Sequence, residues 1–286
     1  MIASYRKELY SFAVTPYGMV FAGSFLMLSG LTTALSNLFS LDSHFEAGTL
    51  AILPWFLLLL LPLLTMRSLA DEQAALPLLY TSVTELWEIV LGKYLAVLSL
   101  VCGVCAVTIL YPVVYDYYGY VNWSNIMSGY LGLILLIGLY SSIGTWVSSV
   151  SSSQAGAAVL TVLIFLVLLL GGQLLPRLPQ GSRSQVAILA VPAILALLTA
   201  YRNGLRPLYL LLLFSVLLLL FGGLAIAPPR FLQGFVGRTG AFISPLNHYA
   251  TFTRGLIRIA DIVYFLSGSV FFLLLSVLQM EKRRWL

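Results

Sequence analysis

Long stretches without a single charged side chain constrain this chain more than any other feature of its sequence. The longest extends from Tyr117 to Pro176, and several others have about the 20 residues that a helix needs to cross the hydrocarbon core of a bilayer. Charged residues make up only 9% of the chain, compared with roughly 25% in a typical soluble domain. The sequence therefore predicts an all-α polytopic membrane protein, with residues 1–286 forming a single transmembrane domain.

The basic balance of the chain does not indicate a nucleic-acid partner. The formal net charge is +5, but Lys and Arg residues are spread thinly between apolar runs instead of forming a patch. Anionic headgroups of membrane lipid are the expected counter-charge.

Small residues within the apolar runs are interpreted as packing residues. Cys102 and Cys105 form a C-x-x-C pair, but no second pair or nearby His supplies the remaining ligands of a metal or redox site. Free Cys usually packs as a small hydrophobe. The glycines of the 117–176 stretch favour close helix packing; they are Gly129, Gly132, Gly138, Gly144 and Gly156.

The uncharged runs predict about eight transmembrane helices. A polar string at 148–154 divides the 117–176 stretch into two spans, because such residues suit a turn at the bilayer surface. Two further spans form a hairpin within an inserted region, 177–238; if this hairpin does not cross, six spans remain. The runs are Leu9–Leu41, Ala47–Met66, Tyr94–Tyr115, the two halves of 117–176, Ser184–Tyr201, Pro207–Pro229 and Ile262–Met280.

The charge distribution favours cytoplasmic termini in a multi-pass protein. That orientation places nine of the 15 Lys and Arg residues inside. The bias is clearer in the early loops around Asp42 and Asp116, which contain no Lys or Arg, and early signals usually dominate topology. A signal peptide is the alternative for the first run, but its apolar stretch exceeds the roughly 7–15 residues of such a signal.

The N-terminal residues 1–15 have the pattern of an amphipathic elbow helix. Ile2, Tyr5, Leu9 and Phe12 are three and four positions apart, which is the spacing of an apolar helical stripe. We expect an interfacial helix on the inner leaflet, with a frayed terminus as the alternative.

Residues 67–93 form the main cytoplasmic feature and contain six charged side chains. Ser68 with Asp71, and Ser82 with Glu85, fit the pattern that caps a helix, and Pro77 separates them. Two short helices joined by a bend are predicted. The second helix carries an apolar face, and the spacing of its residues favours lipid headgroups and a groove on a partner protein equally. The residues of this face are Val83, Leu86, Trp87 and Val90.

Residues 244–261 predict an interfacial helix at the outer surface. Ser244 suits the N-cap and Pro245 the first helical position. Arg254 and Arg258 then share a stripe with Asn247 and Thr251, and are candidate contacts for an anionic headgroup or substrate. A solvated helix face is the alternative.

No catalytic, metal or nucleotide site follows from the sequence. His44 and His248 lie in separate segments, so neither a zinc site nor a Ser-His pair is indicated. Gly92-Lys93 lacks the other residues of a phosphate-binding loop, because position 87 is Trp and position 94 is Tyr. No span carries a central charge of the kind that ion-driven carriers use, so energy for transport would come from elsewhere.

Six stretches in order along nearly the whole chain resemble bacterial ABC-2 type transporter permeases, and most of all the gliding-motility-type permease subunits. They are LPLLTMRSLADE at 61–72, EIVLGKY at 88–94, SGYLGL at 128–133, SPLNHY at 244–249, VYFLS at 263–267 and EKRRW at 281–285. The resemblance implies a six-helix ABC-2 permease core, and the inserted two-helix hairpin at 184–229 is a departure that the shorter six-span members of the family lack. The chain also departs from the family's pattern at Val83, where Pro is usual. The segment between Glu72 and Thr81 is shorter than the family's usual form and lacks its basic pair.

The resemblance implies the permease subunit of an ABC exporter in the cytoplasmic membrane of a bacterium, not an enzyme. Its expected partners are an ABC ATP-binding subunit that holds ATP and Mg, a second permease subunit in a homo- or heterodimer, and an auxiliary membrane protein. No cofactor is expected in this chain. The alternative is a non-transporting polytopic anchor or a membrane-embedded enzyme. The implied ATPase-coupling residues are Asp71, Glu72, Ser82, Val83, Glu85, Leu86, Trp87 and Glu88.

Overall fold

The computed structural model describes residues 2–38, 46–69, 86–118, 121–151, 153–177 and 235–284. The chain divides into two compact units. Unit 1 comprises Met1–Val167 and His248–Leu286, and unit 2 comprises Leu168–Asn247. The predicted hairpin at 184–229 lies outside the described residues.

Within the described ranges every regular element is a helix, which confirms the predicted class. Six helical stretches are long and apolar enough to cross a membrane, so the chain is a multi-pass membrane protein. They match the six spans expected of the core, while the count of eight remains a prediction. The six stretches are Pro16–Ser36, Gly48–Thr65, Leu86–Tyr117, Trp123–Val150, Gln154–Arg177 and Ile259–Lys282.

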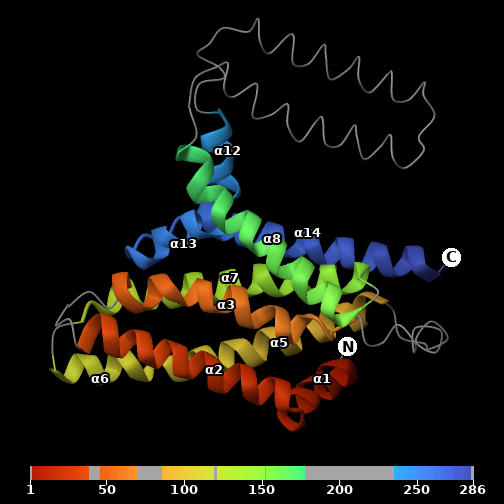
Figure 1. Ribbon diagram of the computed structural model, residues 1–286, viewed down its shortest axis with the longest axis horizontal. Helices are drawn as coiled ribbons and strands as arrows, with labels where there is room; N and C mark the ends of the chain where they lie inside the picture. Colours follow the sequence, from red (N-terminus) through yellow and green to blue (C-terminus); the bar gives the residue numbers. More distant parts are fainter. Residues whose placement is uncertain are drawn as a thin grey trace, which may run out of the picture. The chain divides into compact units, whose positions relative to one another are not determined.

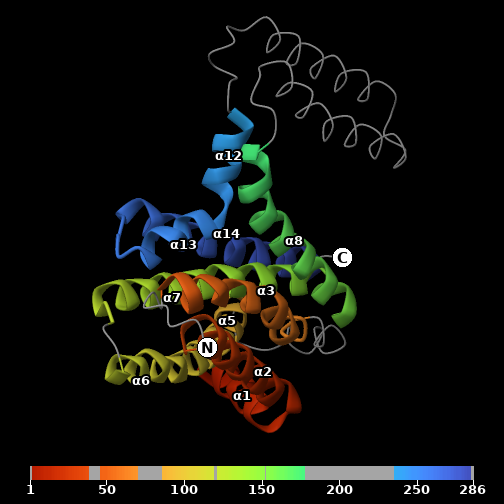
Figure 2. The ribbon, with the colours of Figure 1, turned by 60° about the vertical axis from the view of Figure 1, so that its left-hand side comes forward.

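Helix α7 (Trp123–Val150) is the central helix of unit 1. It packs against α3 (Ala51–Thr65), α5 (Leu86–Thr108) and α14 (Ile259–Arg284), as Figures 1 and 2 show. Its span is 78% buried, a larger share than in any other described span. An apolar helix that is buried over most of its length is the expected centre of a bundle.

Glycines on α7 allow its neighbours to approach closely. A Cβ atom at Gly132 would lie 2.6 Å from Cβ of Phe252, and one at Gly144 would lie 2.6 Å from Cβ of Thr65. Gly129 and Gly138 meet Leu50 and Tyr94 in the same way. The predicted packing role is confirmed for these four glycines. It is wrong for Gly156, which is exposed and would meet only the nearby Ser153.

Prolines explain where the first helices break. Helix α1 (Ile2–Val14) and helix α2 (Pro16–Thr33) are separate because Pro16 forces Thr15 out of the helical region, to φ −82° and ψ 149°. Pro112 has no N–H to bond the carbonyl of Thr108, and α5 accordingly gives way there to α6 (Leu110–Tyr118).

The predicted amphipathic helix at the N-terminus exists, but its apolar stripe packs on protein. Helix α1 packs chiefly on α5. Phe12 is buried, Tyr5 donates a hydrogen bond to Oγ of Ser99 over 3.2 Å, and only Ile2 of the stripe is exposed.

The structure corrects the helix expected over 244–261. Helix α13 (Pro245–Thr253) ends early, and α14 begins only at Ile259. Gly255 adopts φ +80°, and its N–H donates to the Phe252 carbonyl while the N–H of Leu256 donates to the Thr251 carbonyl. These are the two hydrogen bonds of a Schellman C-cap, so the stripe that joined Asn247 to Arg258 does not form.

Unit 2 contains a short helical assembly of its own. It comprises the last turns of α8 (Gln154–Leu174), the 3₁₀ turn η4 (Leu175–Arg177), α12 (Phe235–Ile243) and the start of α13. Gly240 lies against Leu175, where a Cβ atom would come within 2.6 Å of Cδ1. The π-helical turns η1 (Ala34–Leu38) and η2 (Glu46–Leu50) belong to unit 1.

Candidate functional site

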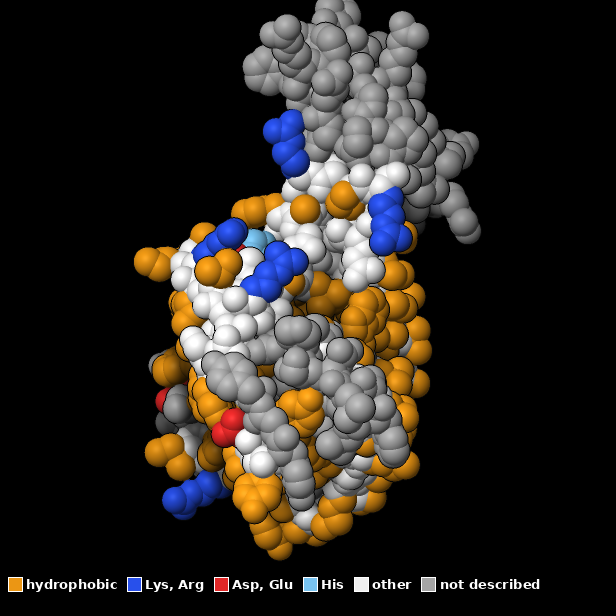
Figure 3. Space-filling model, turned by 90° about the vertical axis from the view of Figure 1, so that its left-hand side faces the viewer, with side chains coloured by type: hydrophobic (Ala, Val, Ile, Leu, Met, Phe, Trp, Pro, Cys, Tyr) orange, Lys and Arg blue, Asp and Glu red, His pale blue; other side chains and the backbone are white. Residues whose placement is uncertain are grey.

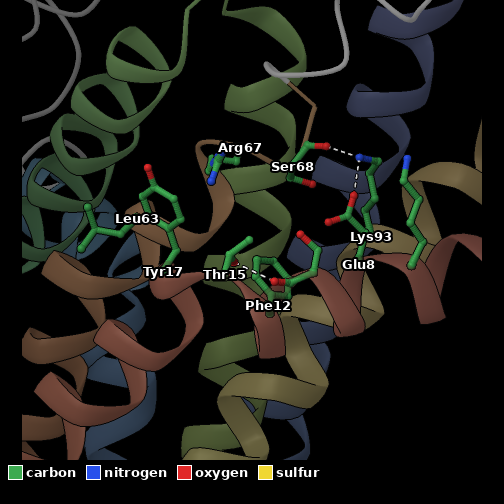
Figure 4. Close-up of a pocket in the computed structure, with 10 residues that line it drawn as sticks. Glu8, Phe12, Thr15, Tyr17, Leu63, Arg67, Ser68 and Lys93 are labelled. Carbon is green, nitrogen blue, oxygen red and sulfur yellow. Dashed lines mark hydrogen bonds and ion pairs between the residues drawn. The ribbon is translucent and has the colours of Figure 1, made fainter.

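A buried ion pair joins α1, α3 and α5 at one end of unit 1. Nζ of Lys93 lies 2.7 Å from Oε1 of Glu8, and it also donates to the carbonyl of Ser68 (Figure 4). The Lys93 side chain is 4% exposed and that of Glu8 is 16% exposed. The last carbonyls of a helix lack partners within it and attract cations. Lys93 therefore bonds a carbonyl in the turn after α3 as well as the Glu8 carboxylate.

Ser148 of α7 bonds the same turn. Its Oγ accepts a hydrogen bond from the N–H of Leu69 over 2.9 Å and donates one to the carbonyl of Met66 over 3.3 Å. We call Glu8, residues 66–69, Lys93 and Ser148 the junction. It fixes the end of α3 to three other helices.

The two ends of the predicted coupling segment meet in one apolar cluster beside the junction. Leu69, the last described residue before position 70, packs with Val90 and Met280, and Leu86 packs against the same cluster. Residues Leu273 and Val277 of α14 complete it. Leu69 and Leu86, on either side of residues 70–85, therefore share one apolar cluster with α14.

The predicted coupling residues are only partly described. Leu86, Trp87 and Glu88 form the first turn of α5. Trp87 is 45% exposed, whereas Leu86 is partly buried in the cluster and is less accessible to a partner. The remaining five, Asp71, Glu72, Ser82, Val83 and Glu85, lie outside the described residues.

The far end of α14 brings together three polar residues that the sequence did not connect. Nδ1 of His248 lies 2.6 Å from Oδ1 of Asp261, and Oγ1 of Thr251 donates to Oδ2 of the same carboxylate over 2.5 Å. The His248 ring stacks on Tyr264, with 4.0 Å between ring centroids. A carboxylate in the first turn stabilises a helix, so this cluster fixes the start of α14 to α13. In the sequence, only Gly255 indicated the turn that brings His248 and Asp261 together.

Arg254 and Arg258 lie in the connection between α13 and α14 and are exposed. They are no longer on a shared helical stripe, and their predicted contact with an anion stays a prediction. On the face shown in Figure 3, hydrophobic side chains are widespread and charged side chains are few. Within the described ranges, no group of three or more His, Cys, Asp or Glu side chains could hold a metal.

A second buried contact ties α13 to the start of α3. Pro54 has no N–H to bond the Leu50 carbonyl, and the Tyr249 hydroxyl donates to that carbonyl over 2.9 Å. Burial raises the pKa of Tyr249 above its usual value. Ser128 of α7 donates to the Phe252 carbonyl over 2.7 Å, so α13 is held by α3 and α7.

A scan against protein-family models and a search of curated proteins each found no match to this chain.

Proposed function

We propose that this chain is the transmembrane permease subunit of an ATP-driven ABC exporter in the cytoplasmic membrane of a bacterium. The observation that carries the proposal is the apolar cluster beside the junction. A segment predicted to dock a cytoplasmic partner starts and ends in one buried cluster that joins three helices of the bundle. The ordered resemblance of six sequence stretches to ABC-2 permeases supports the same reading.

In this proposal the chain performs no chemistry and transmits force. ATP and Mg bind to a separate ABC ATP-binding subunit, which docks on residues 71–88. Closure of that subunit displaces the docked segment. Because Leu69 and Leu86 pack on Val90 and Met280, the displacement reaches α3, α5 and α14 through buried contacts. Packed interiors resist compression and transmit strain.

Trp87 is the side chain best placed to anchor the partner. It is exposed in the first turn of α5, beside the cluster that fixes this turn. Large aromatic side chains dominate many protein interfaces and often contribute about 2 kcal/mol or more when buried in a partner groove. A second permease subunit and an auxiliary membrane protein complete the proposed complex, with both termini in the cytoplasm.

The first test is whether an ABC ATP-binding protein is encoded beside this chain, and the second is co-reconstitution of the chain with that protein. We expect the permease to stimulate ATP hydrolysis, and Trp87→Ala to weaken partner binding by about thirty-fold without changing insertion. Tyr117→Ala is the matched control, because Tyr117 is an exposed aromatic side chain at the far end of the same span.

Unchanged partner binding and unchanged coupled ATP turnover in Trp87→Ala would indicate that Trp87 contacts lipid headgroups and not the partner. Absence of both binding and stimulation by the wild-type chain would contradict the exporter and favour a polytopic anchor or a membrane-embedded enzyme.

A further inference from the structure

Residues 254–260, which connect α13 to α14 and begin α14, carry exposed apolar side chains and two exposed arginines (Figure 2). We call them the interfacial turn. Ile257 is 55% exposed and Ile259 is 79% exposed, although Phe252 before the turn and Asp261 after it are buried. We propose that this turn binds the membrane surface, with its apolar side chains among the upper acyl chains and its arginines on the phosphates of anionic phospholipids.

The length of α14 places the interfacial turn at the level of the lipid headgroups. The helix has 26 residues, and at about 1.5 Å per residue it is about 39 Å long. The hydrocarbon core of a bilayer is only about 30 Å thick. Because the candidate span starts at Ile259, the residues that precede it lie where the chain leaves the hydrocarbon.

Lipid is the expected cover of the turn because its exposed apolar surface continues along α14. Four side chains that are three or four positions apart on this helix are each more than half exposed; they are Ile259, Val263, Leu266 and Val270. They belong to a span of which only 22% is buried inside the protein. Leu256 and Ile257 extend this exposed surface beyond the start of the helix. A large exposed apolar surface on a candidate span is typical of contact with a membrane.

The charges of the interfacial turn favour an anionic surface. Among the described residues, neither Arg254 nor Arg258 forms an ion pair. The carboxylate nearest to them in the sequence is Asp261, whose two oxygens already bond His248 and Thr251. A planar guanidinium binds phosphate oxygens through two parallel hydrogen bonds, and basic side chains are attracted to anionic headgroups.

The interfacial turn is fixed to the bundle at both ends. Gly255 adopts φ +80° and donates its N–H to the carbonyl of Phe252. The same carbonyl accepts a hydrogen bond from Ser128 of α7 over 2.7 Å. At the other end, Asp261 joins α14 to α13. A rigid turn loses little conformational freedom on binding, so its attachment to headgroups also sets the depth of α13 and α14 in the bilayer.

The first measurement locates the turn in the bilayer. A fluorescent label is attached to Ile257→Cys, in a background with Cys102→Ala and Cys105→Ala, in nanodiscs of phosphatidylcholine and phosphatidylglycerol. We expect a nitroxide on the upper acyl chain to quench this label, and aqueous iodide not to reach it. Val270→Cys is the matched control within the span, where a nitroxide near the end of the acyl chain should quench best.

The second measurement tests the arginines. The label on Ile257→Cys is quenched by nitroxide-bearing phosphatidylglycerol and, separately, by nitroxide-bearing phosphatidylcholine, and the ratio reports the local lipid preference. We expect Arg254→Gln and Arg258→Gln each to lower this ratio about fivefold, which corresponds to one basic side chain near an anionic surface. Lys282→Gln should leave the ratio unchanged, because Lys282 is exposed near the other end of α14.

Three results would overturn the proposal. Quenching of the Ile257→Cys label by iodide and not by lipid would mean that the turn faces water. Shielding from both quenchers would mean that the turn packs on protein, such as a second copy of the chain. Equal quenching by the two lipids, or an unchanged ratio in both arginine variants, would contradict recognition of anionic headgroups. The assay needs no ATPase, so its outcome is independent of the exporter proposal.

Discussion

At the scale of single residues, two kinds of side chain decide how the helix ends of this protein are held. Lys93 neutralises a carboxylate and satisfies a helix-terminal carbonyl in a buried position. The Ser148 hydroxyl accepts a hydrogen bond from the N–H of Leu69 and donates one to the carbonyl of Met66, in the same turn. Both side chains bond partners that are far away in the sequence, so their loss would remove the polar contacts that hold the end of α3.

Replacement of Lys93 by Met should destabilise the protein by about 2–3 kcal/mol, because it leaves the Glu8 carboxylate without its partner. The value lies below that for a fully buried pair since Glu8 keeps some contact with water. Thermal unfolding in detergent measures the effect. Adding Glu8→Gln to Lys93→Met should restore part of the loss, whereas equal stability of Lys93→Met and the exposed control Lys282→Met would contradict the role of the pair.

At the scale of elements, helix boundaries follow from backbone chemistry and helix contacts follow from residue size. Pro16 separates α1 from α2, and Gly255 ends α13 in a conformation that other residues rarely adopt. Along α7, Gly132 and Gly144 allow contacts that a side chain would prevent. The two predictions at this scale concern the turn at Gly255 and the contact at Gly144.

Gly255→Ala should cost about 1–2 kcal/mol from the positive φ alone, and more because a Cβ atom there would lie 2.3 Å from Oδ1 of Asn125. Gly103→Ala is the control, since a Cβ atom at Gly103 meets nothing within 4 Å. Unfolding temperatures of the two variants decide the comparison. A Gly255→Ala variant as stable as Gly103→Ala would mean that the turn has another conformation.

Gly144→Leu should disrupt packing of α7 on α3, because even a Cβ atom there would lie 2.4 Å from Oγ1 of Thr65. Overpacking of this kind commonly costs about 1–3 kcal/mol. Size-exclusion profiles and thermal unfolding should show a less stable protein than Gly103→Leu, which places its side chain in open space. Identical stability of the two variants would mean that Gly144 does not pack closely against Thr65.

At the scale of the whole molecule, unit 1 is a helical bundle around α7, and different polar contacts join its helices at its two ends. The junction lies at one end of α14, with Met280 in its apolar cluster, and the contacts of Asp261 lie at the other. One end thus joins the predicted ATPase-docking segment to the bundle. The crossing of the hairpin at 184–229 is the prediction that concerns overall topology.

The hairpin should cross the bilayer twice, because each arm has at least 18 uncharged residues and the turn between them contains Arg202 and Arg206. In a background with Cys102→Ala and Cys105→Ala, a membrane-impermeant thiol reagent should label Asn203→Cys only from the cytoplasmic side. Asn122→Cys, in the predicted outer loop before α7, is the control for the other side. Labelling of Asn203→Cys from outside would leave six spans.

The sequence by itself determined the helical class and the positions of the six described spans. Apolar runs of about 20 residues can satisfy their backbone in lipid only as helices, and this requirement is local. It also located the break at Pro16, since proline restricts the preceding residue wherever it occurs. Gly255 carried a comparable local signal, but the helical spacing of Asn247, Thr251, Arg254 and Arg258 suggested a continuous helix instead.

Only the tertiary structure decided which helix ends meet. Lys93 and Glu8 are 85 positions apart, and Ser148 lies 79 positions from Leu69. No periodicity or motif connects such residues, because a charged or hydroxyl side chain near a span end can bond any neighbour that packing brings to it. The same holds for the pairing of His248 with Asp261, which requires the chain to turn back at Gly255. The junction therefore depends on how α1, α3, α5 and α7 pack together, and the pattern of apolar runs along the sequence does not specify that packing.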